Sequence, residues 1–191
     1  MAGVKGTRTE KNLLAAFAGE SQARMRYTYF ASVANKEGYR QIEGIFMETA
    51  ENEKEHAKRF FKFLEGGMTE ITAAYPAGVI GNTLENLKAA AAGENEEHRV
   101  IYKGMAETAD KEGFKEIAAV FRNISKVEME HEARYLKLAE NIEKGEVFKK
   151  AEKIRWRCRN CGYVHEGDTA PEKCPACIHP QAHFEVAAEN Y

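Results

Sequence analysis

Four cysteines near the end of the chain have the residue type and the spacing needed to bind a metal ion. They form two pairs, Cys158-x-x-Cys161 and Cys174-x-x-Cys177. Four thiolates at this spacing can converge tetrahedrally on one ion. Sulfur-only tetrahedral sites hold zinc, which would be structural, or iron, which would carry one electron.

Disulfide bonds are the alternative use of an even number of cysteines. The first residues, from Met1 to Lys5, contain no apolar segment, so we expect no secretory signal. We therefore expect a cytoplasmic chain, and disulfides are rare in that reducing environment. This expectation favours a metal site over disulfide bonds.

A second set of candidate ligands consists of glutamate and histidine. Among the six histidines, only His56 and His131 have a glutamate three residues earlier, at Glu53 and Glu128. Three residues turn a helix by about 300°, so each glutamate shares a helix face with its histidine. A satisfied structural histidine is the alternative for either one taken alone.

An internal repeat relates the two pairs. Residues 36–42 (KEGYRQI) resemble residues 111–117 (KEGFKEI), and the two Glu-x-x-His pairs lie at the same separation of 75 residues. Each copy also contains an Ala-Gly-Glu motif, ending at Glu20 and at Glu94, with a separation of 74. Two lone glutamates and two Glu-x-x-His pairs are the ligand inventory of a two-metal carboxylate site inside a helical bundle. Surface charge is the alternative, but matched positions in both copies favour the site.

One further carboxylate breaks the symmetry of the repeat. Glu97 follows Glu94 by three residues, whereas the equivalent positions in the first copy, Gln22 and Ala23, are not acidic. A seventh ligand at Glu97 would make the two metal positions inequivalent. Solvent-exposed charge is the alternative, because Glu96 stands beside it.

A pair of tyrosines follows the lone glutamates. Tyr27 and Tyr102 each lie seven or eight residues beyond the glutamate of their copy, about two helical turns along the same face. Their hydroxyls could support ligand carboxylates by hydrogen bonds. Core tyrosines are the alternative.

Helix-favouring sequence surrounds all these residues, and we expect helices at roughly 8–37, 39–65, 80–112 and 114–144. Thr7 and Glu10 form a capping-box signature before the first helix. Tight turns at Gly38 and Gly113 should make the helices of each copy antiparallel. The segment 66–81, if extended, can span a helix of about 42 Å. One long crossover between helices 2 and 3 predicts an all-α, ferritin-like four-helix bundle.

Composition limits the classes of protein to consider. Hydrophobic residues make up 43% and charged residues 30% of the 191 residues, which is typical of a globular chain. The formal net charge of -2 indicates no nucleic acid as partner. No apolar run approaches the roughly 18 residues that span a membrane. We expect a bundle over residues 1–146, a linker over 147–155 and a small metal-knuckle domain over 156–191.

In this order along one chain, the motifs resemble those of the rubrerythrin family, over essentially the whole sequence. The residues that carry the resemblance are Glu20, Glu53, His56, Glu94, Glu97, Glu128, His131 and the four cysteines. The resemblance implies three irons per chain: a di-iron centre in the bundle and one iron in a rubredoxin-like tail. It also implies that Glu97 ligates the oxidised centre and His56 the reduced one.

The resemblance further implies an activity. It is the reduction of hydrogen peroxide to water in oxidative-stress defence, with electrons from rubredoxin or an NAD(P)H-dependent reductase. The helix beyond His131 places the tail far from the di-iron centre of its own chain. The tail of one subunit is therefore expected beside the centre of another, in a head-to-tail homodimer. The alternatives are a ferritin-type iron store and a non-enzymatic metal-binding module with zinc in the tail.

Overall fold

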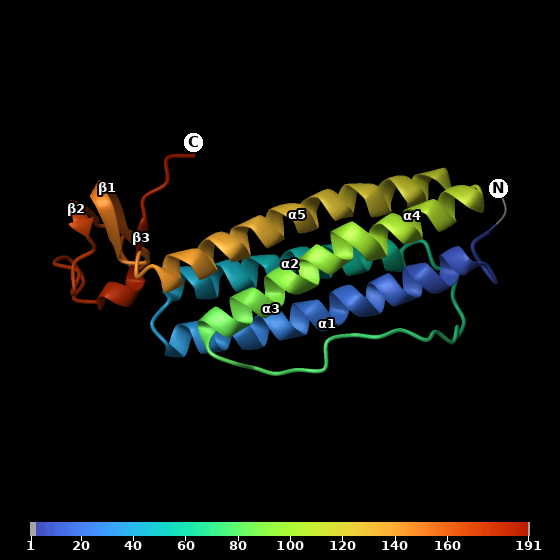
Figure 1. Ribbon diagram of the computed structural model, residues 1–191, viewed down its shortest axis with the longest axis horizontal. Helices are drawn as coiled ribbons and strands as arrows, with labels where there is room; N and C mark the ends of the chain where they lie inside the picture. The colour runs from blue at the N-terminus through green and yellow to red at the C-terminus, as the bar shows by residue number, and fades with distance from the viewer. Residues whose placement is uncertain (1–2, 191) are drawn as a thin grey trace.

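The computed structural model describes residues 3–190, which form a long helical bundle with a small sheet at one end (Figure 1). Three helices are continuous: α1 (Arg8–Lys36), α2 (Arg40–Phe61) and α5 (Lys115–Glu143). The remaining side of the bundle is built from α3 (Thr83–Glu96), η1 (Glu97–Ile101) and α4 (Tyr102–Lys111). The predicted four-helix, ferritin-like arrangement is confirmed.

Each copy of the repeat forms an antiparallel helical hairpin. Gly38 and Gly113 close the two turns with φ angles of 84° and 87°, a left-handed conformation that favours glycine. The N–H groups of Tyr39 and Phe114 each donate to a carbonyl five residues earlier, at 2.8 Å. The same turn chemistry therefore ends the first helix of each hairpin.

The connection between the hairpins runs along the bundle (Figure 1). It begins after α2, which ends at Phe61 rather than near residue 65, and it continues to the start of α3 at Thr83. Asn82 and Glu85 form a complete capping box there. At α1, the Thr7 side chain accepts from the N–H of Glu10, but the Glu10 carboxylate accepts from the N–H of Gly6.

The expectation of one continuous helix over 80–112 is wrong in one respect. Residues Glu97–Ile101 form a π-helix, in which the N–H of Tyr102 donates to the carbonyl of Glu97, five residues earlier. A π-helix of one turn accommodates an additional residue within an α-helix. The separation of the two copies changes from 74 residues at Glu94 to 75 at Tyr102 over this segment.

Two apolar clusters fill the bundle, one on each side of the predicted ligands. Tyr27, Phe46 and Tyr135 belong to the cluster on the side of the first hairpin turn. Tyr102, Phe60 and Phe121 belong to the other cluster. The repeat relates these two aromatic groups, so the polar residues at the centre lie between similar apolar walls.

The C-terminal region is a three-stranded antiparallel sheet of order β2-β1-β3. Its elements are β1 (Lys149–Cys158), β2 (Val164–Thr169), η2 (Gln181–His183) and β3 (Phe184–Val186). Strand β1 occupies most of residues 147–155, which the sequence suggested as a linker. Trp156 and Phe184 are buried beside Cys158 and Cys174, as so small a core requires.

This sheet packs on the end of the bundle that carries the first hairpin turn (Figure 1). Phe148 stacks on Tyr39, with ring centroids 6.2 Å apart. The guanidinium of Arg159 lies so close to Gly44 of α2 that a Cβ there would stand 2.5 Å from Nη2. Among the described residues, none of the helices combines the length and apolarity needed to cross a membrane.

Candidate metal centres

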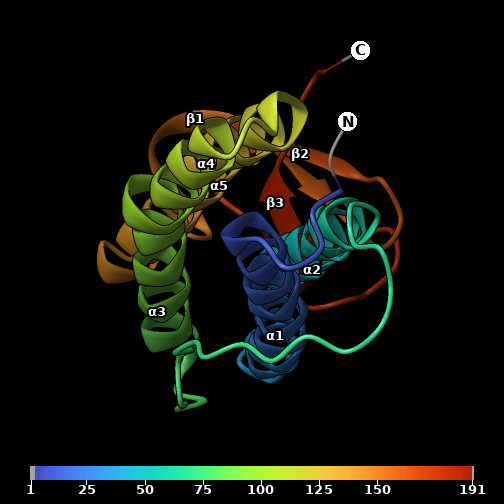
Figure 2. The same cartoon turned by 90° about the vertical axis from the view of Figure 1, so that its right-hand side faces the viewer.

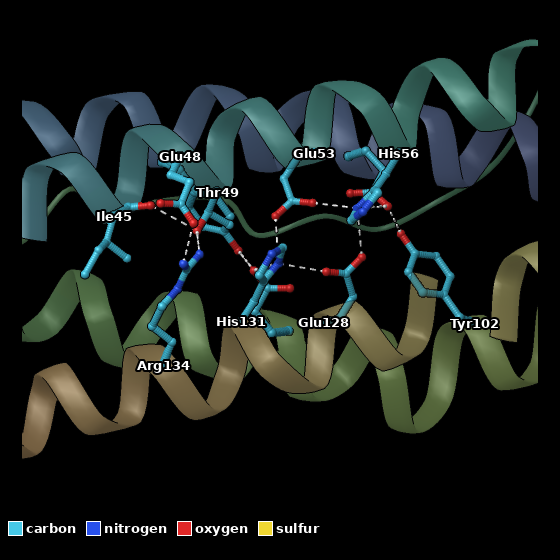
Figure 3. A network of polar contacts seen from close by, with 12 residues as sticks. Ile45, Glu48, Thr49, Glu53, His56, Tyr102, Glu128, His131 and Arg134 are labelled. Atoms are coloured by element: carbon cyan, nitrogen blue, oxygen red, sulfur yellow. Dashed lines mark hydrogen bonds and ion pairs between the residues drawn. The ribbon is translucent and has the colours of Figure 1, made fainter. Parts of the chain in front are cut away.

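Six predicted ligands of the bundle meet at its centre, from four different helices. Side chains from α2 and α5 point toward one another there (Figure 3). The glutamates are at most 1% exposed, which is rare for carboxylates without a partner. The six residues are Glu20 on α1, Glu53 and His56 on α2, Glu94 on α3, and Glu128 and His131 on α5.

The ligand atoms form two groups that the repeat makes equivalent. In the first, His56 Nδ1 lies 2.9 Å from Glu53 Oε2, 3.1 Å from Glu128 Oε1 and 3.7 Å from Glu20 Oε1. In the second, His131 Nδ1 lies 2.9 Å from Glu128 Oε2, 3.2 Å from Glu53 Oε1 and 3.8 Å from Glu94 Oε1. Within each group, the donor atoms lie within 4.8 Å of one another.

Two of the carboxylates belong to both groups. Glu53 and Glu128 each direct one oxygen toward His56 and the other toward His131. Each could therefore bridge two ions. Glu20 and Glu94 belong to one group each, as terminal ligands would.

Unpaired buried oxygens test whether metal ions fit this arrangement. Glu20 Oε2 and Glu94 Oε2 are buried without a hydrogen bond among the described residues. Burying such groups without partners is costly, whereas coordination to a cation satisfies them. Carboxylate and imidazole ligands suit iron, so the residues fit the di-iron group.

The metal-free arrangement shifts several pKa values in opposite directions. Burial and neighbouring carboxylates raise the pKa of Glu20 and of Glu94 well above the ordinary value. Burial also opposes ionisation of Glu53, but hydrogen bonds from His131 and His56 bring its pKa down to about 2. Bonds to Glu128 and Glu53 outweigh burial and raise the pKa of His131 to about 9. Metal ions would therefore displace protons from this cluster.

The two predicted tyrosines hold the terminal glutamates from the opposite hairpin. Tyr27 donates to Glu94 Oε1 and Tyr102 donates to Glu20 Oε1, both at 2.5 Å. Each bond leaves the second oxygen of its glutamate unpaired. The tyrosines therefore restrict how each terminal carboxylate can turn.

Glu97, expected as the seventh ligand, lies beside the cluster but outside both groups. It is the first residue of the π-helix. Burial, together with the charges of Glu128 and Glu53, raises its pKa to about 8. The structure thus places a half-buried carboxylate beside the cluster without making it a member of either ligand group.

A polar clamp that no sequence pattern indicated holds the π-helix against α5. Asn95 Nδ2 donates to Glu132 Oε1, and His98 Nε2 lies 2.7 Å from Glu132 Oε2. Ser125 donates to the carbonyl of His98 at 3.1 Å. These contacts bind the residues on both sides of Glu97 to α5. The change in repeat separation was the available signal for an irregularity here.

The four cysteines converge as predicted, in the sheet at the end of the bundle. All four sulfurs lie within 4.8 Å, with Cys158 Sγ 3.8 Å from Cys177 Sγ and Cys161 Sγ 3.6 Å from Cys174 Sγ. Sulfurs about 2.3 Å from one tetrahedral ion would be roughly 3.8 Å apart. The cysteines are not paired in disulfides. The residues therefore fit one tetrahedral metal ion.

Two equivalent turns present these sulfurs. The N–H groups of Gly162 and Ile178 donate to the carbonyls of Cys158 and Cys174, each at 2.8 Å. The turn at Gly162 also directs the N–H of Tyr163 at the sulfur of Cys161. Ile178 has a φ of 62°, a left-handed conformation that is unusual for a β-branched residue. The N–H of His179 donates to Cys177 and lowers the pKa of that thiol to about 6.

Comparisons with known proteins agree with both sites. Residues 11–139 match the family described as rubrerythrin, and residues 156–185 match the rubredoxin-like domain of rubrerythrin. The chain is 69% identical over 188 residues to a rubrerythrin of Porphyromonas gingivalis, covering 98% of this chain and 94% of the relative. It is 58% identical over 191 residues to a rubrerythrin of Nitratidesulfovibrio vulgaris, covering all of both chains.

Solved structures extend the comparison to the fold. Fully reduced, all-ferrous nigerythrin has a TM-score of 0.63 and 31% identity, covering 97% of this chain and 92% of that one. A bacterioferritin of Desulfovibrio desulfuricans has a TM-score of 0.63 and 17% identity, covering 73% and 82%. The second similarity supports the ferritin-like fold alone.

Proposed function

We propose that this chain, which belongs to the rubrerythrin family, reduces hydrogen peroxide to water at a di-iron centre. The observation that carries the proposal is the pair of buried ligand groups that share Glu53 and Glu128. Two ferrous ions, when bound there, supply the two electrons that break the O–O bond of peroxide. With two protons, the products are two water molecules.

The chain's own side chains have separate tasks in this proposal. Glu53 and Glu128 hold both metal positions, while Glu20 and Glu94 complete one position each. Tyr27 and Tyr102 orient these terminal carboxylates through their hydroxyl groups. These four glutamates and two tyrosines are the residues that the two hairpins contribute equally.

Glu97 and His56 have an asymmetric task. We assign Glu97 as a ligand of the oxidised centre and His56 as a ligand of the reduced one. Glu97 is half-buried beside the cluster, and His56 Nδ1 faces three carboxylates. Both residues therefore lie near the same metal position, which they would ligate alternately.

The four cysteines would hold a third iron, which returns electrons one at a time. Twelve residues of α2 separate Gly44, which contacts the sheet, from His56, a distance of about 18 Å along the helix. We therefore infer a head-to-tail homodimer, in which the cysteine site of one chain serves the centre of the other. Rubredoxin or an NAD(P)H-dependent reductase in the cytoplasm would be the donor.

Rapid mixing of the anaerobically reduced protein with hydrogen peroxide tests the activity. We expect fast reoxidation with one peroxide consumed per di-iron centre, and strong visible absorption from ferric iron in the cysteine site. Glu97→Gln should slow reoxidation, whereas Glu55→Gln, at an exposed carboxylate of α2, should not. Accumulation of iron mineral would indicate storage instead, and a colourless cysteine site would indicate zinc.

A further inference from the structure

A cavity of about 120 Å³ lies beside the carboxylate–histidine cluster. Its walls come from α1, from the segment around the π-helix and from the crossover between α2 and α3. The metal ligands are buried, so a substrate must reach them through such a space. The position of this cavity makes it a candidate route.

The inner wall of the cavity reaches the metal site. Glu97 and Tyr102 both line it. The Tyr102 hydroxyl donates to Glu20, and the charge of Glu97 acts on the pKa of Glu20. Through the Tyr102 hydroxyl, the cavity wall therefore directly contacts one of the candidate ligands, Glu20.

The outer wall is the crossover, which passes across α1 toward α3 (Figure 2). Residues 73–76 line the cavity, and Tyr75 is the largest of them. The Tyr75 hydroxyl donates to the carbonyl of Ala15 at 2.7 Å. Its ring lies over Gly19, where a Cβ would stand 3.6 Å from Cε1. Tyr75 is 39% exposed, so it stands between the cavity and solvent.

The repeat provides an internal comparison for this wall. Gly93 is the counterpart of Gly19, but the neighbour of a Cβ at Gly93 would be the Arg26 guanidinium, at 3.6 Å. Arg26 is held by Gln22 and by the ring of Tyr27. A tyrosine from the crossover therefore covers only the glycine of the first hairpin.

We propose that this cavity admits the oxidant and that Tyr75 restricts it to hydrogen peroxide and molecules of similar size. This inference rests on the proposed peroxide reduction. An alkyl hydroperoxide accepts the same two electrons and two protons when its O–O bond breaks, giving an alcohol and water. Selection between the two must therefore come from shape, because the chemistry is the same. A water molecule has a volume of about 30 Å³, so the cavity has room for several, and selection by size must come from its entrance at Tyr75 rather than from its volume.

Relative reaction rates with hydrogen peroxide and tert-butyl hydroperoxide test this selection in the iron-loaded protein. The wild type should prefer hydrogen peroxide by at least about 100-fold, within the range that steric pockets provide. Tyr75→Ala should reduce this preference at least about tenfold, mainly by accelerating the alkyl hydroperoxide. Tyr75→Phe keeps the ring and should retain the preference. Tyr29→Ala removes an exposed tyrosine of α1 outside the cavity and is the matched control.

A second measurement does not depend on turnover. With Zn²⁺ in the cysteine site, uptake of Mn²⁺ by the bundle can be followed through the electron paramagnetic resonance signal of free Mn²⁺, because carboxylates suit this ion. Tyr75→Ala should accelerate uptake, and Gly19→Ala, which adds a methyl group under the ring, should slow it. Tyr29→Ala should leave uptake unchanged.

The outcomes separate the two proposals. Equal peroxide preference in the wild type and in a folded Tyr75→Ala variant would overturn the role of Tyr75. Unchanged Mn²⁺ uptake in both Tyr75→Ala and Gly19→Ala would overturn the route itself. A wild-type protein that takes up metal but does not react with hydrogen peroxide would instead contradict the proposed function.

Discussion

The two hairpins of the bundle contribute equal ligands but differ in length. Tyr27 follows Glu20 by seven residues in the first hairpin, whereas Tyr102 follows Glu94 by eight in the second. Seven residues turn an α-helix by about 700°, which keeps both side chains on one face. An eighth would rotate Tyr102 by about a further 100° and remove it from Glu20. The π-helix absorbs this residue, so Tyr102 keeps the bond that Tyr27 has.

This additional residue in the second hairpin shows how a duplicated site can become asymmetric. The shared features, the ligand groups and the tyrosine bonds, require matching geometry in both hairpins. The features of the second hairpin alone are Glu97, the π-helix and the clamp through Glu132. In the first hairpin, small residues occupy the positions equivalent to the clamp; Ala57, for example, is the repeat counterpart of Glu132. Substitutions can therefore separate shared from added features.

The largest expected effect concerns the shared ligands. Glu53→Gln or Glu128→Gln should abolish binding of both bundle metals, because each carboxylate belongs to both ligand groups. Glu20→Gln or Glu94→Gln should remove only one. Metal analysis of anaerobically reconstituted protein measures the loss. A Glu53→Gln chain that keeps one tightly bound bundle metal would show that Glu53 does not bridge.

The next largest effect is a dependence of stability on pH that arises from residues of the second hairpin. The pKa of Glu97 in the metal-free chain is raised from 4.5 to about 8, so its contribution to stability is full below pH 4.5 and is lost as pH rises through 8. His131, with a pKa of about 9, acts with the same sign between pH 6.5 and 9. The free energy of unfolding should therefore fall by up to roughly 7 kcal/mol between pH 5 and 9.

The substitution Glu97→Gln gives the second hairpin the amide that the first has at Gln22. It should make this decline shallower, leaving the parts due to His131 and to the raised pKa values of Glu20 and Glu94. Denaturant titrations of the metal-free proteins at several pH values provide the measurement. A parallel decline in wild type and variant would mean that Glu97 titrates normally.

A smaller effect is expected at the clamp of the π-helix. Glu132→Ala removes the acceptor of both Asn95 and His98 and should cost about 1–3 kcal/mol of stability. Glu55→Ala is the control in the first hairpin, since Glu55 forms only an exposed pair with Lys58 and should change stability by less than about 0.5 kcal/mol. Equal losses in the two variants, measured by denaturant unfolding, would show that the clamp is not special.

Sequence patterns predicted the shared features better than the added ones. Glu-x-x-His spacing and the repeat were sufficient to place the ligands of both groups, because regular helices convert spacing into direction. The π-helix has no residue signature of its own, and only the change in separation from 74 to 75 indicated it. The clamp depends on α5 packing beside η1, which no local pattern encodes.

The C-terminal region illustrates the same limit. The charged residues of 147–155 suggested a linker, but Ile154, Trp156 and Cys158 alternate along β1 and face the small core. This period of two was a strand signal that the surrounding lysines and arginines obscured. The cysteine spacing was independent of it, so the metal site was predicted although the strand that carries it was not.

The smallest expected effect concerns the aromatic walls. Tyr135 and Phe60 occupy equivalent positions, and both are fully buried. Tyr135 packs against Tyr27 at a centroid distance of 5.5 Å, as Phe60 packs against Tyr102 at 5.7 Å. The Tyr135 hydroxyl has no hydrogen-bond partner among the described residues. Replacing an unpaired buried hydroxyl with hydrogen is neutral or stabilising, so Tyr135→Phe should raise stability by about 0–1 kcal/mol.

The reverse substitution sharpens the test. Phe60→Tyr should destabilise the protein, because it buries a new hydroxyl beside Phe121 and Tyr102, and the Tyr102 hydroxyl already donates to Glu20. Neither variant should change how many metals the bundle binds, since both side chains lie outside the ligand groups. Thermal unfolding and metal analysis of the two variants check these expectations. A loss of one metal in Tyr135→Phe alone would instead make this hydroxyl part of the second ligand group and add one more difference between the hairpins.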